Sequence, residues 1–377
     1  MKIVADIDLY QVEALFSHFG ELVLLPGREI KNHHVLDADA LIVRSTTLVS
    51  EQLLKGTSVK FVASATSGTD HVNLDYLSAN GITFADAKGS NANAVTDYCL
   101  AAISEFYGQK GLDDLKPNVG IIGNGMIGNR LAKKIKGLGW NVLINDPLQS
   151  DFKSKIDSET SYYSLDEIAQ CNIISVHVPL TWSGLYATGN LLGKNFFRAL
   201  PQNAIIINTS RGGVIDEDVL IDMTSEREDL IMVIDVWNNE PYCNEALIEL
   251  AAIATPHIAG YSGRAKANGV LQILRAFLEF FGLDIDSSSV FDSKIDAYVE
   301  LTHVNDCADA MRKVFSIVDI SSRFKKSVAS GKNVDGNDSF DGLRKSLVTR
   351  AEYCEYAMPS FISEDAVRFL SAVGFRN

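Results

Sequence analysis

A glycine-rich segment of fixed spacing constrains the fold of this chain more than any other feature of its sequence. Gly123, Gly125 and Gly128 form the pattern G-x-G-x-x-G, with the apolar run Val119–Ile122 before it and the helix-forming run Asn129–Lys136 after it. In a strand–turn–helix unit, the first glycine allows a tight turn, the second lets the backbone approach a pyrophosphate, and the third lets helix and strand pack closely. The start of the helix then offers N–H groups to the phosphates. The segment therefore predicts a dinucleotide site, the alternative being a glycine turn before an ordinary helix.

An acidic residue lies where such a site would hold the ribose. Asp146 lies 18 residues after Gly128 (146 − 128), at the end of the next apolar run, where the expected spacing is about 20 residues. A carboxylate in this place accepts a hydrogen bond from the adenosine 2′-hydroxyl and repels a 2′-phosphate. Asp146 therefore predicts NAD as the cofactor and not NADP, unless it is a solvated residue of the turn Asp146-Pro147.

Short apolar runs alternate with helical patterns in two successive blocks. Such alternation is typical of βαβ units with parallel sheets, and nearly continuous apolar runs are typical of strands buried on both faces. The sequence therefore predicts two doubly wound α/β domains, with long helices near Asn91–Tyr107 and Arg264–Phe281. From Asp286 the pattern changes to polar and amphipathic segments, which predicts a small third domain of α+β type. The predicted strands are Lys2–Ala5, Leu22–Leu25, Ala40–Arg44, Lys60–Ser64, Thr83–Ala85, Val119–Ile122, Val142–Ile144, Ile173–Val176, Ala204–Ile207, Ile231–Val236 and Ile253–Thr255.

Three segments that follow predicted strands carry an arginine, a glutamate and a histidine. They are Arg211, Glu240 and His257, each a few residues beyond the end of its strand. Because ligands of parallel sheets bind beyond the carboxyl ends of the strands, the three side chains can converge. A histidine can take the proton of a hydroxyl group, a carboxylate on its second ring nitrogen fixes the tautomer, and an arginine can bind a carboxylate. Together they predict a site that dehydrogenates an alcohol, although each alone is more often structural: a core histidine, a Glu-Pro turn or a surface ion pair.

Charge and cysteine content narrow the class of protein. Lys and Arg number 34 while Asp and Glu number 48, and the resulting net charge of −14 argues against binding nucleic acid or anionic lipid. No apolar stretch reaches the roughly 18 residues of a membrane span, and Met1–Asp6 carries a charge where a signal peptide would be apolar. The 5 cysteines are far apart and form no Cys-x-x-Cys motif. We therefore expect no metal site, no disulfide framework and a cytoplasmic location.

The combined pattern resembles the D-isomer-specific 2-hydroxyacid dehydrogenases. The matching segments are Gly123–Gly128, His177–Thr181, Asn208–Asp216, Asp235–Pro241 and Thr255–Gly260. The resemblance implies an NAD-dependent enzyme whose hydride-transfer residues are Arg211, Glu240 and His257. It also implies a substrate domain made of residues 1–93 and 260–285, and an NAD-binding domain made of residues 94–259.

The same resemblance implies individual contacts. The substrate contacts would be Ser45, Thr66 and Tyr261. The cofactor contacts would be Gly123, Gly125, Met126, Ile127, Gly128, Asp146, Val178, Thr209, Ser210, Arg211, Asp235 and Gly260. The cation that holds a substrate phosphate stays open among Arg44, Arg264 and Arg350.

Within this family, the chain is most similar to the members that oxidise 4-phospho-D-erythronate in pyridoxal 5′-phosphate biosynthesis. Arg44-Ser45, Ala65–Val72, His257–Tyr261 and the tail segment Phe340–Lys345 carry that similarity. It implies that residues 286–377 form a dimerisation domain and that the chain is a homodimer. Two other functions stay open: a dehydrogenase of another 2-hydroxy acid, such as 3-phosphoglycerate, glyoxylate or hydroxypyruvate, and an NAD-sensing binding protein that resembles a corepressor.

Overall fold

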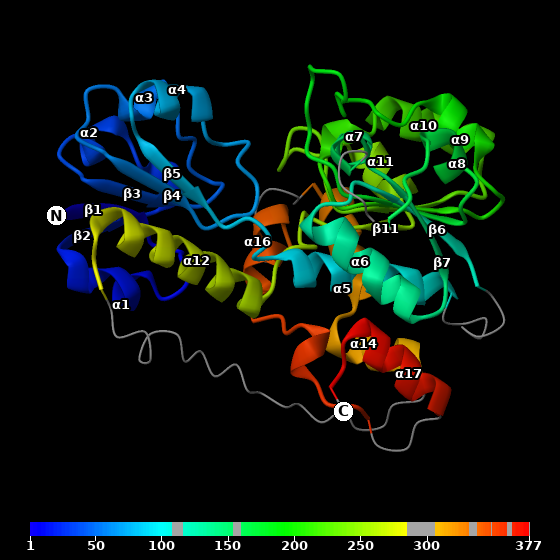
Figure 1. The fold of residues 1–377 in the computed structure, drawn as a ribbon. Helices are drawn as coiled ribbons and strands as arrows, with labels where there is room; N and C mark the ends of the chain where they lie inside the picture. The colour runs from blue at the N-terminus through cyan, green and yellow to red at the C-terminus, as the bar shows by residue number, and fades with distance from the viewer. Residues whose placement is uncertain are drawn as a thin grey trace. The chain divides into compact units, whose positions relative to one another are not determined.

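A computed structural model describes residues 1–107, 116–153, 160–284, 306–331, 338–347, 349–359 and 364–376. The chain forms two compact units, Met1–Asn91 with Ser262–Ile295 and Ala92–Tyr261 with Asp296–Asn377. Each unit is built on a parallel sheet, so the expectation of two α/β domains is confirmed (Figure 1). Within these described ranges, no helix is both long and apolar enough to span a bilayer.

The first unit carries a parallel sheet with the strand order β2-β1-β3-β4-β5. All residues of β3 and β4 are buried, as the apolar runs require of strands that are covered on both faces. The strands are β1 Lys2–Asp6, β2 Glu21–Leu25, β3 Ala40–Val43, β4 Phe61–Ser64 and β5 Thr83–Asp86. The helices are α1 Val12–Phe16, η1 Ser17–Phe19, η2 Gly27–Glu29, α2 Asn32–Val35, α3 Glu51–Leu54, α4 Leu74–Ala79 and α12 Gly263–Phe281.

Alternate strand residues of this unit point into two apolar layers. On one face, Ile3, Ile42 and Phe61 pack against Phe16 of α1 and Phe277 of α12. The ring of Phe277 meets the rings of Phe16 and Phe61 edge-on, at centroid distances of 5.4 and 5.9 Å. On the other face, the intervening strand residues pack against α2, α3 and α4 (Figure 1). The late helix α12 is therefore part of the first unit, although the second unit separates it from β5 in the sequence.

The second unit carries a parallel sheet with the strand order β11-β10-β9-β8-β6-β7. Its strands are β6 Asn118–Ile122, β7 Asn141–Asn145, β8 Ile173–Val176, β9 Ile205–Asn208, β10 Ile231–Ile234 and β11 Ile253–Ala254. Its helices before the tail are α5 Ala92–Tyr107, α6 Met126–Gly137, α7 Pro147–Lys153, α8 Leu165–Ile168, α9 Lys194–Ala199, η4 Gly212–Val214, α10 Glu217–Glu226 and α11 Glu245–Leu250. The helices of the tail are α14 Cys307–Val314, α15 Ile317–Ala329, α16 Phe340–Ser346, η5 Tyr353–Glu355 and α17 Glu364–Val373.

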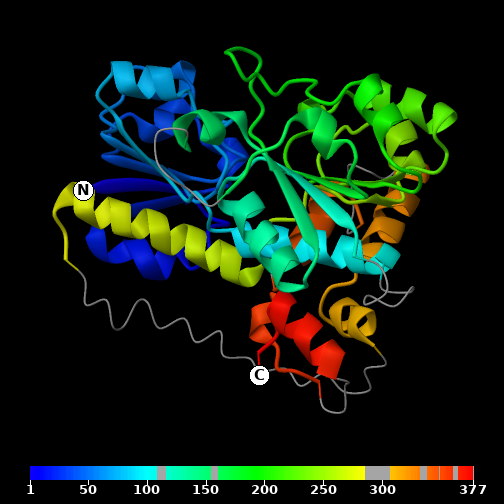
Figure 2. The same cartoon turned by 45° about the vertical axis from the view of Figure 1, so that its right-hand side comes forward.

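Two apolar layers also sandwich this second sheet. Residues of α5 and α6 form one layer together with α14 and α17 of the tail, which lie beside each other (Figure 2). Residues of α8, α9, α10 and α11 form the other layer together with α16. Helix α15 contributes to both layers because it lies against β11, the last strand of the sheet. The tail therefore completes both layers of the second unit.

The tail, which the sequence predicts to be a small third domain from Asp286, packs on the second sheet. Its described regular elements are helices apart from a single β-bridge between Ala357 and Arg376, and they belong to the same compact unit as the second sheet. At the sheet edge, Ser321 of α15 accepts a hydrogen bond from the backbone N–H of Ala254 in β11 at 2.9 Å. The helix thereby satisfies a donor that an edge strand leaves open. Short amphipathic helices bury little apolar surface alone, which explains why these pack on a neighbouring sheet.

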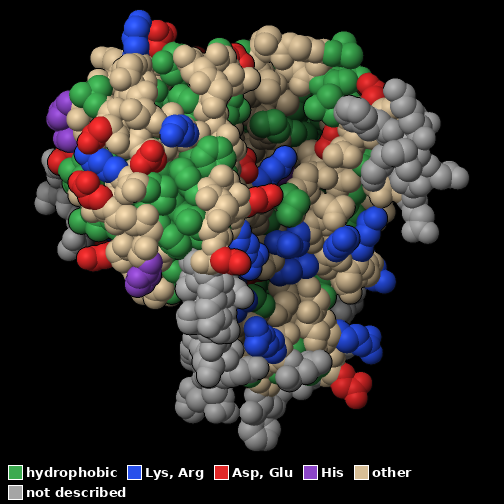
Figure 3. Space-filling model, turned by 60° about the vertical axis from the view of Figure 1, so that its left-hand side comes forward, with side chains coloured by type: hydrophobic (Ala, Val, Ile, Leu, Met, Phe, Trp, Pro, Cys, Tyr) green, Lys and Arg blue, Asp and Glu red, His purple; other side chains and the backbone are tan. Residues whose placement is uncertain are grey.

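The chain has a net charge of −14, yet basic side chains are also exposed. Figure 3 shows Lys and Arg side chains beside acidic and apolar ones on the face drawn. An acidic chain can therefore still offer basic groups to a small anion.

Candidate active site

The glycine-rich turn between β6 and α6 has main-chain contacts that only glycine permits. Gly123 has a φ of 96°, and a Cβ there would lie 2.5 Å from the carbonyl oxygen of His177. A Cβ on Gly128 would lie 1.9 Å from the carbonyl oxygen of Gly123. The Cβ position of Gly125, by contrast, has no atom within 4 Å. Two glycines thus bring strand and helix together, and the third leaves the backbone accessible to a pyrophosphate.

Asp146 lies beside this turn because β6 and β7 are neighbours in the sheet. Its carboxylate accepts hydrogen bonds from the backbone N–H groups of Asn124 at 2.8 Å and Gln149 at 2.9 Å. Carboxylate oxygens have further lone pairs, so the same group can still accept from a ribose hydroxyl. Met126 and Ile127 form the first turn of α6, and 51% of Met126 is exposed. An open glycine turn, a helix start and an adjacent carboxylate together fit a dinucleotide.

The end of β8 lies between the glycine turn and the loop that follows β9. Nε2 of His177 forms a hydrogen bond with Oγ of Ser175 at 2.8 Å, and Nδ1 lies 3.5 Å from Oγ1 of Thr209. Burial lowers the pKa of His177 to about 3, so its ring is neutral at ordinary pH. Val178 is half-buried and follows directly. His177 is therefore a structural link between neighbouring strand ends.

The loop after β9 presents Arg211 and is shaped by Asn208. Nδ2 of Asn208 donates to the carbonyl oxygen of Arg211 at 3.1 Å, and Oδ1 accepts from the N–H and the hydroxyl of Ser210 at 3.1 and 2.7 Å. Thr209 and Ser210 are buried, whereas Arg211 is only half-buried. A Cβ on Gly212 would lie 2.2 Å from the carbonyl carbon of Trp237. This close approach places the arginine loop against the loop that carries Glu240.

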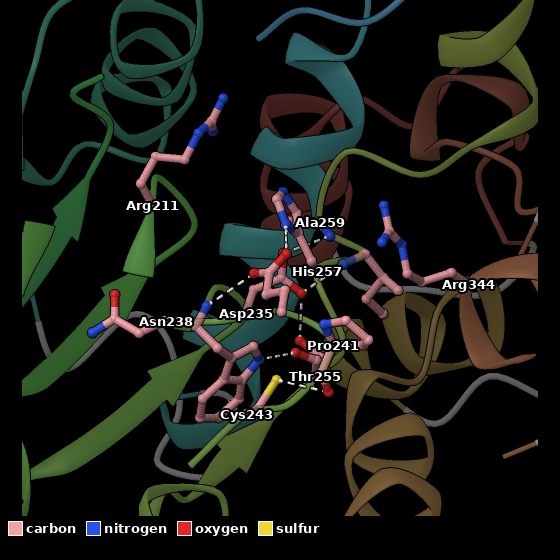
Figure 4. A network of polar contacts seen from close by, with 12 residues as sticks. Arg211, Asp235, Asn238, Pro241, Cys243, Thr255, His257, Ala259 and Arg344 are labelled. Atoms are coloured by element: carbon pink, nitrogen blue, oxygen red, sulfur yellow. Dashed lines mark hydrogen bonds and ion pairs between the residues drawn. The ribbon is translucent and has the colours of Figure 1, made fainter. Parts of the chain in front are cut away.

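Glu240 and His257 form a hydrogen-bonded pair (Figure 4). Nδ1 of His257 lies 2.7 Å from Oε2 of Glu240, whose Oε1 accepts from the backbone N–H of Trp237 at 3.0 Å. Burial acts to raise the pKa of Glu240, but the charge and hydrogen bond of His257 and the N–H of Trp237 hold it below its ordinary value. An ionised carboxylate can only accept, so Nδ1 carries the proton and Nε2 has the free lone pair. The pair thus has the geometry of a general base with an orienting carboxylate.

Asp235 holds the segment that carries His257. It is fully buried, and its carboxylate accepts hydrogen bonds from the hydroxyl of Thr255 at 2.6 Å and from the backbone N–H groups of Ile258 at 2.8 Å and Ala259 at 2.9 Å. Burial raises the pKa of this carboxyl to about 6, although the charge of His257 and the three hydrogen bonds act the other way. His257 itself has a φ of 54°, a left-handed conformation that is uncommon outside glycine. The buried carboxylate stabilises that backbone, a role that the sequence interpretation of Asp235 as a cofactor contact did not include.

The predicted substrate residues come from both units. Tyr261 lies four residues after His257 (261 − 257), directly after the half-buried Gly260, in the second unit. Ser45 and Thr66 belong to the first unit, where each lies two residues beyond the end of its strand. Because β3 and β4 pair in parallel, these two hydroxyl groups lie at the same edge of the first sheet. Their contact with a substrate stays a prediction.

Two of the three arginines that the sequence suggests for a substrate phosphate, Arg44 and Arg350, donate hydrogen bonds to other groups of the protein. Arg44 donates to Asp6 at 2.8 and 3.1 Å and to Asp8 at 2.6 Å. Arg350 is buried, and it donates to three backbone carbonyl groups at 2.8 to 3.3 Å, among them that of Ala94. The sequence interpretation missed Arg344 of α16, which donates to the Tyr261 hydroxyl at 2.6 Å. Arg344 lies in the segment Phe340–Lys345 that carries the resemblance, but its place beside Tyr261 depends on how the tail packs.

Comparison with known proteins agrees with this geometry. Residues 108–259 match the family described as D-isomer specific 2-hydroxyacid dehydrogenase, NAD binding domain. Curated relatives carry the name erythronate-4-phosphate dehydrogenase: one from Marinomonas sp. (strain MWYL1) is 38% identical over 100% of this chain and 99% of its own. Another, from Hahella chejuensis (strain KCTC 2396), is 44% identical over 76% of this chain and 74% of its own.

Solved structures are similar over most of their own length. The NAD⁺-bound 3-phosphoglycerate dehydrogenase of Entamoeba histolytica has a TM-score of 0.62 at 27% identity, covering 75% of this chain and 95% of that one. A D-lactate dehydrogenase of Aquifex aeolicus, complexed with NAD and lactic acid, has a TM-score of 0.61 at 21% identity, covering 75% of this chain and 96% of that one. At that identity, the second similarity supports the fold alone.

Proposed function

Because the chain belongs to the D-isomer specific 2-hydroxyacid dehydrogenase family, we propose that it oxidises 4-phospho-D-erythronate to 3-hydroxy-2-oxo-4-phosphooxybutanoate in pyridoxal 5′-phosphate biosynthesis. It is an NAD-dependent dehydrogenase, as the sequence predicts. The names of its curated relatives support this substrate, and they do not favour the other 2-hydroxy acids or a corepressor-like role. Among the contacts of the site, the pairing of His257 with Glu240 at 2.7 Å carries the proposal of the reaction.

The residues of the second unit divide the reaction between them. Arg211 binds the substrate carboxylate and the C2 oxygen, since a guanidinium offers two parallel donors. Nε2 of His257 takes the proton of the C2 hydroxyl, and Glu240 stabilises the imidazolium that forms. Bound NAD supplies the acceptor for the hydride that leaves C2. Asp235 keeps the histidine segment in its left-handed conformation.

The proposed cofactor contacts follow strands of the second sheet at their carboxyl ends. We assign the pyrophosphate to the turn Gly123–Gly128, where Gly125 is open and Met126 and Ile127 begin α6. Asp146 takes the ribose hydroxyl groups. The remaining proposed contacts follow strands β8, β9 and β11, and they are Val178, Thr209, Ser210, Arg211 and Gly260.

The proposal extends to the state of the protein in the cell. We assign the substrate contacts Ser45 and Thr66 to the first unit and cofactor binding to the second, and we propose that the tail mediates a homodimer. None of the five cysteines forms a disulfide in the described part of the chain, and we propose a reducing compartment and a cytoplasmic location.

An NAD-linked assay with purified protein tests the proposed function. We expect 4-phospho-D-erythronate to give a higher kcat/KM than 3-phosphoglycerate, glycerate or lactate. His257→Ala should lower kcat about 10²- to 10⁴-fold, the usual contribution of a proton-transfer group, with NAD affinity unchanged. His18→Ala makes the same change at an exposed histidine and should match the wild-type enzyme. A preference for another acid would overturn the substrate, and a fully active His257→Ala would overturn the site.

A further inference from the structure

We propose that Arg344, in the tail helix α16, binds the phosphate group of the substrate and so determines specificity for phosphorylated 2-hydroxy acids. The inference rests on the proposed function for the identity of the acid, whereas the anion site is argued from contacts within the second unit. Phe340 and Leu343 are buried and anchor α16 in the apolar layer that it shares with α15. The helix comes from the part of the chain beyond residues 108–259, which match the family.

The guanidinium of Arg344 is fixed on Tyr261. Its Nη2 donates to the phenol oxygen at 2.6 Å, and its Cζ lies 4.8 Å from the centroid of the Tyr261 ring and 5.3 Å from that of Phe340. The hydrogen bond and the two rings hold the guanidinium in one orientation. A fixed guanidinium offers planar donors in a defined place, and phosphate is an acceptor that complements them.

Among the described residues, no carboxylate accepts a hydrogen bond from Arg344, although the charge of Arg344 helps to lower the pKa of Glu240. Oδ1 of Asp341 lies 3.8 Å from Nη1, which is beyond hydrogen-bond distance, and the side chain of Arg344 is only 17% exposed. Glu240 is already bonded to His257 and Trp237. In the described part of the chain, Nε of Arg344 is buried without a hydrogen-bond partner. Such a buried donor is unfavourable, so an anion that completes the site would be bound strongly.

The position of Arg344 suits the far end of a substrate with two anionic groups. In Figure 4, Arg211 and Arg344 lie on opposite sides of His257. Arg211 serves the carboxylate next to C2, and Arg344 serves the phosphate on C4. Arg44 and Arg350, by comparison, already bind carboxylates and carbonyl groups of the protein.

The test compares 4-phospho-D-erythronate with D-erythronate, which lacks the phosphate. For Arg344→Ala with NAD, we expect kcat/KM on the phosphorylated acid to fall about 10- to 100-fold, mainly through KM, because charge-assisted hydrogen bonds contribute about that much. The rate on D-erythronate should stay unchanged. Arg344→Lys keeps the charge and should restore part of the loss, and Lys345→Ala, at the exposed neighbouring residue, should match the wild-type enzyme. Circular dichroism confirms that each variant is folded.

Calorimetric titration with inorganic phosphate gives a second, independent measurement. The wild-type protein should bind phosphate more tightly than Arg344→Ala by the same factor as the kinetic loss. Equal losses on both acids, or equal phosphate affinities, would overturn the proposal. A wild-type enzyme that oxidises neither acid would refute the proposed function instead, and the phosphate titration would still decide the role of Arg344.

Discussion

The backbone at His257 has a conformation that its own side chain does not favour. A left-handed residue other than glycine costs roughly 1 kcal/mol or more, and such residues persist where the surroundings determine them. Here the carboxylate of Asp235 binds both N–H groups that follow, those of Ile258 and Ala259. The hydroxyl of Thr255 completes this set and itself bonds to Tyr98 at 2.6 Å. The direction of the imidazole is therefore set by a buried network and not by the local sequence.

Glu240→Gln tests the carboxylate partner of that imidazole. An amide cannot balance the charge of the imidazolium, so we expect kcat to fall about 10- to 100-fold with little change in the KM for NAD. The pKa of Glu240 lies below its ordinary value, so the wild-type carboxylate is ionised throughout neutral pH. The amide of the variant does not ionise, so raising the pH should not recover the lost activity. Steady-state kinetics between pH 6 and 9 measure this, with Glu245→Gln on the exposed face of α11 as the control. Full activity of Glu240→Gln would contradict the assigned role.

Single residues were predictable where their type and their strand determine their place. Gly123, Gly128 and Asp146 could be identified because strand pairing puts the end of β7 beside the glycine turn. Glu240 and His257 could be identified as a pair because they follow β10 and β11, which are neighbours in the sheet. Arg344 could not, since its contact with Tyr261 joins residues 83 apart in sequence.

His177 connects the ends of three neighbouring strands in the second sheet. His177 joins β8 to the loop after β9, and its carbonyl oxygen lies against Gly123 at the end of β6. Its ring packs without charge, because burial lowers its pKa to about 3. A proton on this ring would thus favour the unfolded chain, where the imidazole is hydrated.

His177→Gln tests this link through the pH dependence of stability. The folded pKa of about 3 lies below the ordinary value of 6.5, so the unfolded chain binds the proton first as the pH falls. Between pH 7 and pH 5 the wild-type protein should therefore lose about 1–2 kcal/mol more of its free energy of unfolding than the variant, whose amide does not titrate. Urea denaturation at the two pH values measures the difference, and His18→Gln at an exposed histidine should follow the wild-type protein. If His177→Gln and the wild-type protein lost the same free energy of unfolding between the two pH values, the ring of His177 would not be kept neutral by the fold.

Elements were predicted well where the strands are short, apolar and buried on both faces. The run Ile173–Val176 is strand β8 without change, and the predicted helix Arg264–Phe281 differs from α12 by one residue at its start. The run Ile231–Val236 extends beyond β10, which ends at Ile234, because apolar character continues into the loop toward Glu240. The tail helices were not resolved by pattern alone, since their apolar faces make sense only against the second sheet.

At the scale of the whole molecule, the tail completes the two apolar layers of the second unit. Met311, Phe315 and Phe375 of the tail share one apolar layer with the fully buried Tyr98 of α5. Phe324 packs on Trp237 of the other layer at a centroid distance of 6.3 Å. The tail therefore buries side chains in both layers of the second sheet and contributes to the folding of that unit. This holds whether or not the tail also binds a second copy of the chain.

Deleting residues 286–377 tests both properties of the tail. The deletion exposes the apolar residues of α5 and uncovers the edge strand β11, so we expect aggregates or unstable monomers and no active dimer. The full chain should sediment at twice its mass of 41.2 kDa, because the proposed dimer rests on the tail. Sedimentation velocity gives the mass and so shows whether the dimer forms. Circular dichroism with thermal denaturation shows whether the shortened chain is folded. A folded monomer with a less cooperative thermal transition would show that the tail is needed more for dimer formation than for the folding of the second sheet. A soluble, fully active dimer without these residues would show that neither the second unit nor the interface depends on the tail.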